Sequence, residues 1–397
     1  MKIPLNWRTG RVGDLGCVVT GSTPSTGDDG NFGGEIPFVT PGDLGRSSDV
    51  SKAERSLSAQ GAKKSRLIPS GSVLVVCIGS TIGKLGFAGC ELVTNQQINA
   101  LVPNSGTDGR FALYEIARIG NEFRRLAGTQ AVPILSKSDF SDFPVNIPPL
   151  PEQHKIADIL STWDEALEKL DALIAAKDRR KKAIMQQLLS GRLRFPGFAK
   201  QPWKTSRMNQ LLERVFRPIE WSPEMSLSLV SLRRRYGGLF RRPDVIGSEY
   251  KTQDLHELRA GDFLVSKRQV VHGAWAFVTP EFEGGHVSKE YAIFENIAPA
   301  KLHMPFFAWL SQTPRMIRLA RVASTGVHIE KLIFDPDVFL RESIRIPGDI
   351  AEQQKIAAVL DTADAELRLL LAQRTALDQQ KRGLMQRLLT GKIRVNP

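Results

Sequence analysis

The sequence lacks any apolar run long enough to cross a membrane. None of its 397 residues lies in an uncharged apolar stretch of the ~18 residues or more that a spanning helix needs. The first residues, MKIPLNWRTGRVGDLG, also lack the apolar segment of a secretory signal. We therefore expect a cytoplasmic protein with no membrane partner.

Cysteine and histidine are scarce. The three cysteines, Cys17, Cys77 and Cys90, are an odd number without metal-ligand spacing, and Cys77 lies inside the apolar run SVLVVCIG. The six histidines form no HExxH motif. This pattern predicts neither a disulfide framework nor a metal site, and it fits a reducing compartment.

Catalytic motifs are also missing, although three segments come near to one. The segment GSTIGKL (79–85) has too few residues between its glycines for a phosphate-binding loop, and Leu85 replaces the required Ser or Thr. In NIPPL (146–150), Ile147 separates the asparagine from the prolines that an adenine methyltransferase motif needs. In 243–251 the carboxylates of Asp and Glu are too close in sequence for a nuclease motif. We therefore expect a non-catalytic chain.

Acidic residues are outnumbered by basic ones. The chain has 54 Lys and Arg against 42 Asp and Glu, a net charge of +12 and a pI near 9.7. Such a balance favours a polyanionic partner, of which nucleic acid is the commonest. The alternative is a basic surface that keeps the protein in solution.

One long segment occurs twice. Residues 152–194 and 352–394 align without a gap at an offset of 200, and 20 of the 43 aligned positions are identical. Both copies follow a heptad pattern, which predicts two helices of about 37 residues and ~55 Å each. Such a narrow apolar stripe favours pairing of the two helices over separate packing of each on its own domain, and an internal pseudo-twofold favours the antiparallel arrangement.

The predicted helix-pairing residues share the apolar heptad positions of both copies. In the first copy they are Ile156, Leu160, Trp163, Leu167, Leu170, Ile174, Ile184 and Leu188. In the second they are Ile356, Leu360, Leu367, Leu370, Leu377, Leu384 and Leu388. Lys177, Lys181, Arg374 and Lys381 occupy the polar positions of the same stripe.

The rest of the chain forms two diverged domains that precede the helices. We predict a first head at 1–150, a helix at 151–195, a second head at 196–350 and a helix at 351–397. Both heads read as mixed α/β domains with many loops, which makes the fold class α+β. Expected strands include 36–39, 73–79, 262–267 and 273–278, and expected helices are 111–128 and 306–321.

The candidate DNA-contacting residues differ between the heads. Arginine can bind phosphates or guanine edges, and side-chain amides can pair with adenine. In the first head the candidates are the amide, hydroxyl and lysine side chains of Thr81, Lys84, Gln96, Gln97 and Gln130. In the second head they are the basic residues Arg233, Arg234, Arg235, Arg241, Arg242, Lys267 and Arg268. For any one of them the alternative is an ordinary turn residue or a solvated surface charge.

The repeated PLPEQxKIAxIL…LLxGxxR pattern at 150–194 resembles the spacer regions of type I restriction–modification specificity subunits, and its second copy at 350–394 keeps most of it. The segments GSTPS (21–25), IPFVTPGDL (36–44) and TNQQINAL (94–101) are similar to stretches of that family's target-recognition domains.

The resemblance implies that each head reads one half of a bipartite site in double-stranded DNA. It also implies that the helices set the gap between the half-sites and dock two methyltransferase subunits, which supply S-adenosylmethionine. Restriction subunits that use ATP and magnesium would join for cleavage, and this chain would hold no cofactor. The alternative is a DNA-binding or coiled-coil scaffold without a restriction partner.

Overall fold

The structure, a computed structural model, describes residues 4–45, 49–127 and 132–395. The chain divides into two compact units. Unit 1 combines Met1–Leu173 with Leu370–Pro397, and unit 2 is Ile174–Leu369. Among the described residues, no helix is long and apolar enough to cross a membrane.

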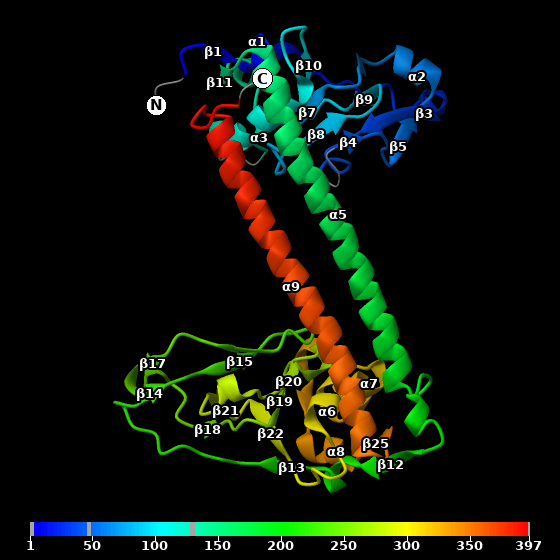
Figure 1. Ribbon diagram of the computed structural model, residues 1–397, viewed down its shortest axis with the longest axis vertical. Coiled ribbons are helices and arrows are strands. Elements are labelled where there is room, and N and C mark those ends of the chain that lie inside the picture. The colour runs from blue at the N-terminus through cyan, green and yellow to red at the C-terminus, as the bar shows by residue number, and fades with distance from the viewer. Residues whose placement is uncertain (1–3, 46–48, 128–131, 396–397) are drawn as a thin grey trace. The chain divides into compact units, whose positions relative to one another are not determined.

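Two long helices correspond to the repeated segment. They are α5 (Leu150–Leu189) and α9 (Ile350–Leu388), with 40 and 39 residues (Figure 1). Each helix is followed by a glycine with positive φ, Gly191 at 72° and Gly391 at 69°. Glycine is favoured there because a left-handed residue after the last turn lets following amides bond to free carbonyls of the helix.

In unit 1 the two helices run antiparallel, because their ion pairs connect rising numbers on α5 with falling numbers on α9. Asp164 pairs with Lys381, and Asp171 pairs with Arg374 at 3.0 Å. The lysine and the arginine occupy polar positions of the predicted stripe. Charged side chains at these places favour one register over its slipped alternatives.

Unit 2 repeats the arrangement with its own portions of the helices. Lys181 pairs with Asp364 at 2.9 Å, and Lys177 pairs with Glu366. Asp164 and Lys381 in unit 1 are the repeat equivalents of Asp364 and Lys181, so the same pair occurs in both units with the helices exchanged. The predicted antiparallel pairing of the two helices is confirmed within each unit.

The head of unit 1 contains three sheets and short helices. One sheet has the order β2-β10-β7-β8-β4, a second the order β5-β3-β9-β6, and β1 pairs with β11. The strands are β1 (Arg8–Arg11), β2 (Gly16–Thr20), β3 (Phe32–Val39), β4 (Asp49–Val50), β5 (Arg55–Leu57), β6 (Leu67–Ile68), β7 (Val73–Val76), β8 (Leu85–Ala88), β9 (Leu92–Thr94), β10 (Ile98–Pro103) and β11 (Pro144–Ile147). The helices are α1 (Val12–Leu15), α2 (Ala59–Lys63), α3 (Gly109–Leu126) and α4 (Lys137–Ser141).

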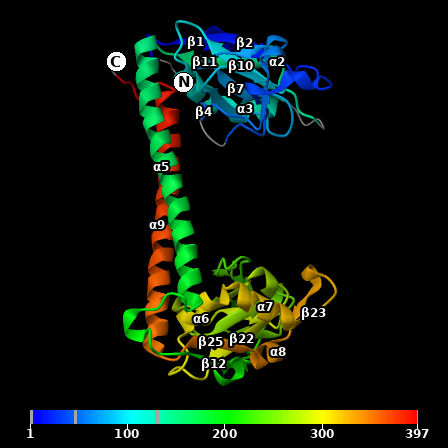
Figure 2. The ribbon, with the colours of Figure 1, turned by 90° about the vertical axis from the view of Figure 1, so that its right-hand side faces the viewer.

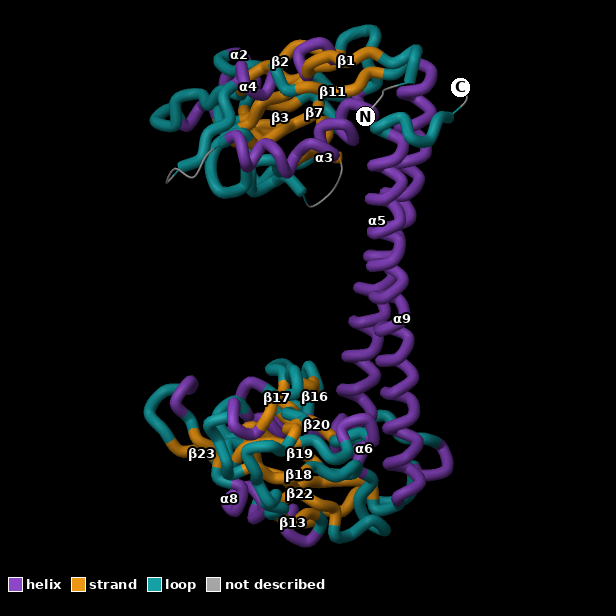
Figure 3. The backbone as a smooth tube through the Cα atoms, turned by 90° about the vertical axis from the view of Figure 1, so that its left-hand side faces the viewer, coloured by secondary structure: helices purple, strands orange, loops and turns teal. Residues whose placement is uncertain are grey.

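The main core of unit 1 joins this head to both long helices. Helix α3 lies along the β2-β10-β7-β8-β4 sheet (Figure 3) and buries Phe111 and Phe123 there. Ile156 and Leu160 of α5 and Leu388 of α9 belong to the same core. These three predicted helix-pairing residues therefore also attach the helices to the head.

Unit 2 has one larger sheet and several two-stranded ones. Its largest sheet has the order β13-β22-β19-β20, and five two-stranded ribbons surround it. The strands are β12 (Trp203–Arg207), β13 (Leu212–Val215), β14 (Ser226–Leu227), β15 (Val230–Leu232), β16 (Leu239–Arg241), β17 (Val245–Ile246), β18 (Leu255–Glu257), β19 (Phe263–Ser266), β20 (Trp275–Phe277), β21 (His286–Ser288), β22 (Tyr291–Asn296), β23 (Ser324–Thr325), β24 (Ile333–Phe334) and β25 (Ser343–Pro347). The helices are α6 (Met304–Ser311), α7 (Pro314–Val322) and α8 (Pro336–Arg341).

The two heads share one framework. The order β13-β22-β19-β20 in unit 2 matches β2-β10-β7-β8 in unit 1, and the ribbon β12-β25 matches β1-β11. The core of unit 2 likewise takes Ile356, Leu360 and Leu188 from the long helices. The heads are therefore repeats in fold although their sequences have diverged.

The single helix expected at 306–321 is wrong. The structure has two helices there, α6 and α7, which Figure 2 shows side by side in unit 2. The break comes at Thr313-Pro314, because proline has no N–H to continue the ladder and disfavours a helical residue before it. Pro314 instead begins α7, where a missing N–H costs nothing.

Candidate nucleic-acid interface and helix junctions

In unit 1, two loops and one returning segment meet at one edge of the head. The backbone N–H of Cys77, at the start of the β7–β8 loop (77–84), donates to the carbonyl of Gln97 in the β9–β10 loop (95–97) at 2.8 Å. The carbonyl of Cys77 accepts from the N–H of Leu135, also at 2.8 Å. Three segments are thus joined through a single residue.

Unit 2 has the same junction. The N–H of Lys267, at the start of the β19–β20 loop (267–274), donates to the carbonyl of Glu290 at 2.9 Å, and its carbonyl accepts from Phe334 at 2.9 Å. Lys267 therefore corresponds to Cys77, and the β19–β20 loop corresponds to the β7–β8 loop. This equivalence is invisible in the loop sequences themselves.

Six of the predicted DNA-contacting residues lie on these equivalent loops. Thr81 and Lys84 are on the β7–β8 loop, Gln96 and Gln97 are on the β9–β10 loop, and Lys267 and Arg268 are on the β19–β20 loop. Gln130 lies outside the described residues. The contacts of these residues with DNA stay predictions.

Several of these side chains already have partners in the protein. The ammonium of Lys84 donates to the carbonyl of Pro41 at 2.8 Å, so it ties the β7–β8 loop to the segment 40–45. The amide oxygen of Gln96 accepts from the hydroxyl of Thr23 at 2.6 Å, and that of Gln97 accepts from Asn95 at 3.0 Å. The two glutamine amides are therefore held in place before any ligand arrives, as recognition side chains need to be.

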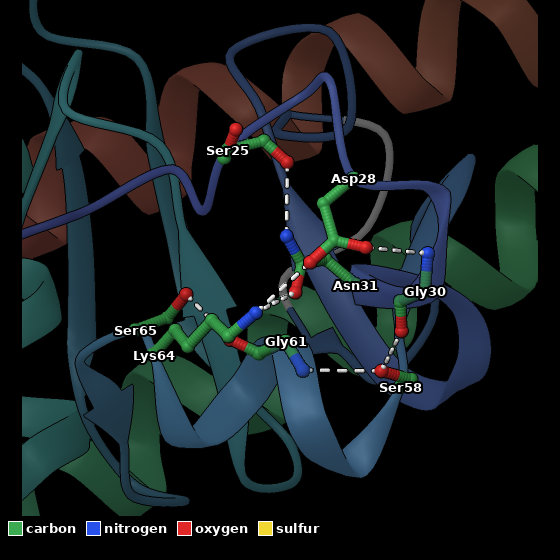
Figure 4. Close-up of polar contacts among 8 residues, drawn as sticks. All are labelled: Ser25, Asp28, Gly30, Asn31, Ser58, Gly61, Lys64 and Ser65. Atoms are coloured by element: carbon green, nitrogen blue, oxygen red, sulfur yellow. Dashed lines mark hydrogen bonds and ion pairs between the residues drawn. The ribbon is translucent and has the colours of Figure 1, made fainter.

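A polar network holds the segment that carries Thr23. Lys64 donates to Asp28 and to buried Asn31, both at 3.0 Å, and Asn31 donates to the carbonyl of Ser25 at 2.9 Å (Figure 4). The hydrogen bond from Lys64 and its charge lower the pKa of Asp28. The network anchors the GSTPS segment to α2, beside the β9–β10 loop.

The arginines of the second head do not form one cluster. Arg233 lies over the ring of Phe240 at 4.5 Å, and Arg234 pairs with Glu330 at 3.4 Å. Arg235 is exposed, and its backbone is bonded to the β19–β20 loop.

The remaining basic candidates contact other parts of the head. Arg241 donates to the carbonyl of Glu281 at 2.6 Å, Arg242 lies 6.0 Å from the ring of Tyr250, and Arg268 pairs with Glu290 at 2.5 Å. Lys267 donates to the carbonyl of Lys289 at 2.6 Å, and burial together with nearby Arg214 lowers the pKa of Lys267. Lys267 therefore acts in the loop junction, whereas the exposed side chains of Arg234 and Arg268 are each paired with a carboxylate.

A buried glutamine joins each head to its long helix. The amide nitrogen of Gln153 donates to the carbonyls of Pro148 and Gly106, and its oxygen accepts from the N–H of Asp108 at 3.0 Å. Since the glutamine meets backbone groups alone, the side chains of the head can vary without disturbing the junction.

Gln353 makes the same three bonds in unit 2. Its nitrogen donates to the carbonyls of Pro347 and Lys301, and its oxygen accepts from the N–H of His303 at 2.9 Å. Identical glutamines in the repeat thus serve identical structural roles.

Each junction also contains an ion pair. A buried glutamate at the start of one long helix pairs with an arginine just beyond the end of the other helix. In unit 1, Glu152 pairs with Arg394 at 2.7 Å and accepts from the indole of Trp7 at 2.9 Å. Burial opposes ionisation of Glu152, but the bonds from Arg394 and Trp7 outweigh it and lower its pKa. In unit 2, Glu352 pairs with Arg194, which also donates to two backbone carbonyls.

An aromatic side chain of each head reaches the coiled coil. In unit 1 the hydroxyl of Tyr114 donates to Asp164 at 2.6 Å, and Lys381 lies 5.3 Å from its ring. Burial first, and then this bond to Asp164, raise the pKa of Tyr114.

Unit 2 has an indole at the equivalent place. The indole of Trp309 donates to Asp361 at 2.8 Å, and Lys181 lies 5.9 Å from its ring. Beside these contacts are two equivalent surface pockets, of 540 Å³ in unit 1 and 480 Å³ in unit 2. Both are lined by the paired lysine and two further basic residues, which are Arg374 and Arg382 in unit 1 and Lys182 and Arg235 in unit 2.

The junction residues Glu152, Gln153 and their copies stand out in the sequence only as identities in the repeat. Most of their partners lie 45 or more positions away, up to 242. The signal that could have found them is the identity of polar residues beside an apolar stripe.

Comparison with known proteins shows what part of the chain is similar to. Residues 4–176 match the family model of the type I restriction modification DNA specificity domain. Part of the chain is also similar to specificity subunits of type I restriction enzymes. The MjaIX specificity subunit of Methanocaldococcus jannaschii is 31% identical over 173 residues, which are 42% of this chain and 40% of that subunit. The matched stretch is thus less than half the length of that relative.

Longer alignments cover the rest of the chain. The MjaVIII specificity subunit of the same organism is 20% identical over 423 aligned positions, which cover 100% of this chain and 95% of the relative. The crystal structure of the type I S subunit from M. genitalium superposes with a TM-score of 0.62 at 14% identity, and covers 98% of both chains. A chain from a structure of type I complex assembly gives a TM-score of 0.61 at 15% identity and covers 99% of this chain. These structures share its fold.

Proposed function

We propose that this chain acts as a specificity subunit and reads a bipartite site in double-stranded DNA, one half with each head. The observation that carries the proposal is the pair of equivalent loop junctions, at Cys77 and at Lys267. Both heads place the same loops at the same edge of the same sheet but fill them with different side chains. One framework with two sets of side chains is what two different half-sites require.

The helices would set the gap between the half-sites and dock two methyltransferase subunits. The support is the repetition of the helix junctions, since two equivalent pockets and two equivalent ion-pair sets offer one partner the same surface twice. The docked subunits would bring S-adenosylmethionine, and restriction subunits would bring ATP and magnesium. This chain would contribute no catalytic group and would act in the cytoplasm.

The test is to co-express the chain with its candidate methyltransferase partner in a methylation-free host and to map modified adenines by single-molecule sequencing. The expected result is one bipartite motif with a fixed gap, which disappears when this chain is omitted. A well-formed complex without methylation would contradict the proposal and would favour the scaffold alternative. Binding to a DNA column that weakens steeply with salt would separate a DNA-binding scaffold from a coiled-coil adaptor.

The role of the helices in the gap has its own test. Insertion of one helical turn in both α5 and α9 should lengthen the gap by about one or two base pairs, because a turn adds ~5.4 Å and a base pair occupies ~3.4 Å. Both half-sites should stay unchanged. Altered letters in either half-site would contradict this role.

A further inference from the structure

The β15–β16 hairpin of the second head ends in a strained turn. Its register pairs Leu232 with Leu239, and beyond that pair the N–H of Arg233 donates to the carbonyl of Gly238 at 3.0 Å, so Arg235 and Tyr236 are the two central residues of the turn. The N–H of Gly237 closes the turn on the carbonyl of Arg234 at 3.2 Å. Arg235 and Tyr236 both have φ of 57°, and no other non-glycine residue of the described chain has a positive φ.

Side chains of this size are unfavourable in such a turn. Two-residue hairpins with both central residues left-handed prefer Asn-Gly or Asp-Gly, because a Cβ crowds the backbone at positive φ. Glycines are present one position later, at 237 and 238, but not in the turn itself. Strain of this kind persists where the side chains or the backbone make contacts that compensate for it.

The contacts join the turn to the β19–β20 loop. The N–H of Arg235 donates to the carbonyl of His272 at 2.7 Å, and the N–H of Tyr236 donates to the carbonyl of Gly273 at 2.9 Å. The half-buried ring of Tyr236 covers Gly273, where an added Cβ would lie 2.8 Å from the ring. The loop that begins with Lys267 and Arg268 is therefore held at its other end by the turn.

The same turn reaches a third segment. Arg234 pairs with Glu330, between β23 and β24, and the imidazole of His272 lies 3.3 Å from the same carboxylate. The turn thus connects the β15–β16 hairpin with two of the segments that meet at Lys267.

The first head holds its equivalent loop by different means. There the ammonium of Lys84 bonds to the carbonyl of Pro41, and the side chain of Lys84 packs against Gly45. The two heads therefore have equivalent loops, but each head holds its loop with a different segment.

From this geometry we propose that the Arg235–Tyr236 turn determines the specificity of the second head by positioning the β19–β20 loop against its DNA half-site. The inference rests on the proposed function. Tyr236 is a positioning residue that holds the loop through Gly273, and the residues of the loop make the contacts with DNA.

The test replaces the turn with the sequence that such turns prefer, Arg235→Asn with Tyr236→Gly, in the full chain with its methyltransferase partner. Because the new turn is free of strain, the thermal midpoint should be unchanged or higher. Methylation at sites with one mismatch in the second half-site should rise about tenfold relative to matched sites, the discrimination that one good base contact supplies. Discrimination at the first half-site should be unchanged. Wild-type discrimination at both half-sites would overturn the proposal.

Two matched variants separate the ring from the charge. Tyr236→Phe keeps the ring over Gly273 and should keep the wild-type motif, and a relaxed second half-site in this variant would contradict positioning by packing. Tyr236→Gly alone removes the ring and keeps Arg235, so it should relax second half-site discrimination as much as the double variant does. Wild-type discrimination in Tyr236→Gly would assign the effect to Arg235 and would overturn the positioning role.

Hydrogen exchange of the free chain supplies a readout that needs no DNA. Amides of 267–274 should exchange about tenfold faster in the Asn-Gly variant, since the loop loses the packing that restrains its local opening. Unchanged exchange would show that the turn does not hold the loop. If the wild-type chain gives no site-specific methylation, the proposed function and the specificity role fail together, and exchange still decides whether the turn holds the loop.

Discussion

The two units differ least where each head meets the helices and most where the heads face outward. Gln153 and Gln353 make the same three bonds, whereas the loops that begin at Cys77 and Lys267 share backbone bonds and no side-chain chemistry. The difference indicates that attachment and recognition depend on separate residues. The residues at the head–helix junctions attach each head to the same pair of helices, and the loop residues allow each head to read its own target.

Substitution of the buried glutamines at the two head–helix junctions should have the largest effect on stability. In Gln153→Glu or Gln353→Glu a carboxylate would face two backbone carbonyls, so each variant should lose about 3 kcal/mol of unfolding free energy. The loss should shrink at low pH, where the protonated acid can donate again. Calorimetry of both variants checks the comparison, and clearly unequal losses would show that the two junctions are not equivalent.

Substitution of the arginines that pair with Glu152 and Glu352 should destabilise the two units to different extents. Arg194→Ala leaves the buried carboxylate of Glu352 without its cation and should cost about 3 kcal/mol. Arg394→Ala should cost about half as much, because Trp7 still donates to Glu152 and the side chain of Arg394 is 38% exposed. Chemical denaturation measures both, and a larger loss for Arg394→Ala would contradict this ordering.

The two tryptophans offer a smaller contrast. Trp7 donates its indole N–H to Glu152, while the buried indole N–H of Trp203 has no partner among the described residues. Trp7→Phe should therefore cost about 1.5 kcal/mol more than Trp203→Phe, the value of a hydrogen bond to a charged acceptor. Equal losses in thermal denaturation would show that the bond of Trp7 adds nothing.

Glu152 should give unit 1 a small dependence of stability on pH. The pKa of Glu152 is held below its usual value of 4.5, so its contribution is complete above that pH and is lost as the pH falls through the lowered value. Glu152→Gln should remove this part of the acid sensitivity. Thermal midpoints of the wild type and the variant between pH 6 and pH 3 should converge at the acid end, and parallel curves would contradict the assignment.

The two long helices could be predicted from the sequence, because their apolar heptad stripe is a local pattern that occurs twice. The sequence was insufficient for the head–helix junctions, since the partners of Glu152 and Gln153 are far away in sequence and are often backbone atoms. It also misjudged 306–321, where Pro314 ends one helix and begins another. Lys84 was selected as a DNA contact from its residue type, yet its ammonium bonds to Pro41, a partner that no local pattern reveals.

Unit 2 is one continuous stretch of chain, whereas the core of unit 1 includes Leu388 and Leu389 from the end of α9. During synthesis, every residue of unit 2 is added to the chain, and emerges from the ribosome, before the last core residues of unit 1. The second head can thus complete its fold first, and the first head stays open along one side until the final helix is made. Translation itself therefore gives the two similar halves an order of assembly.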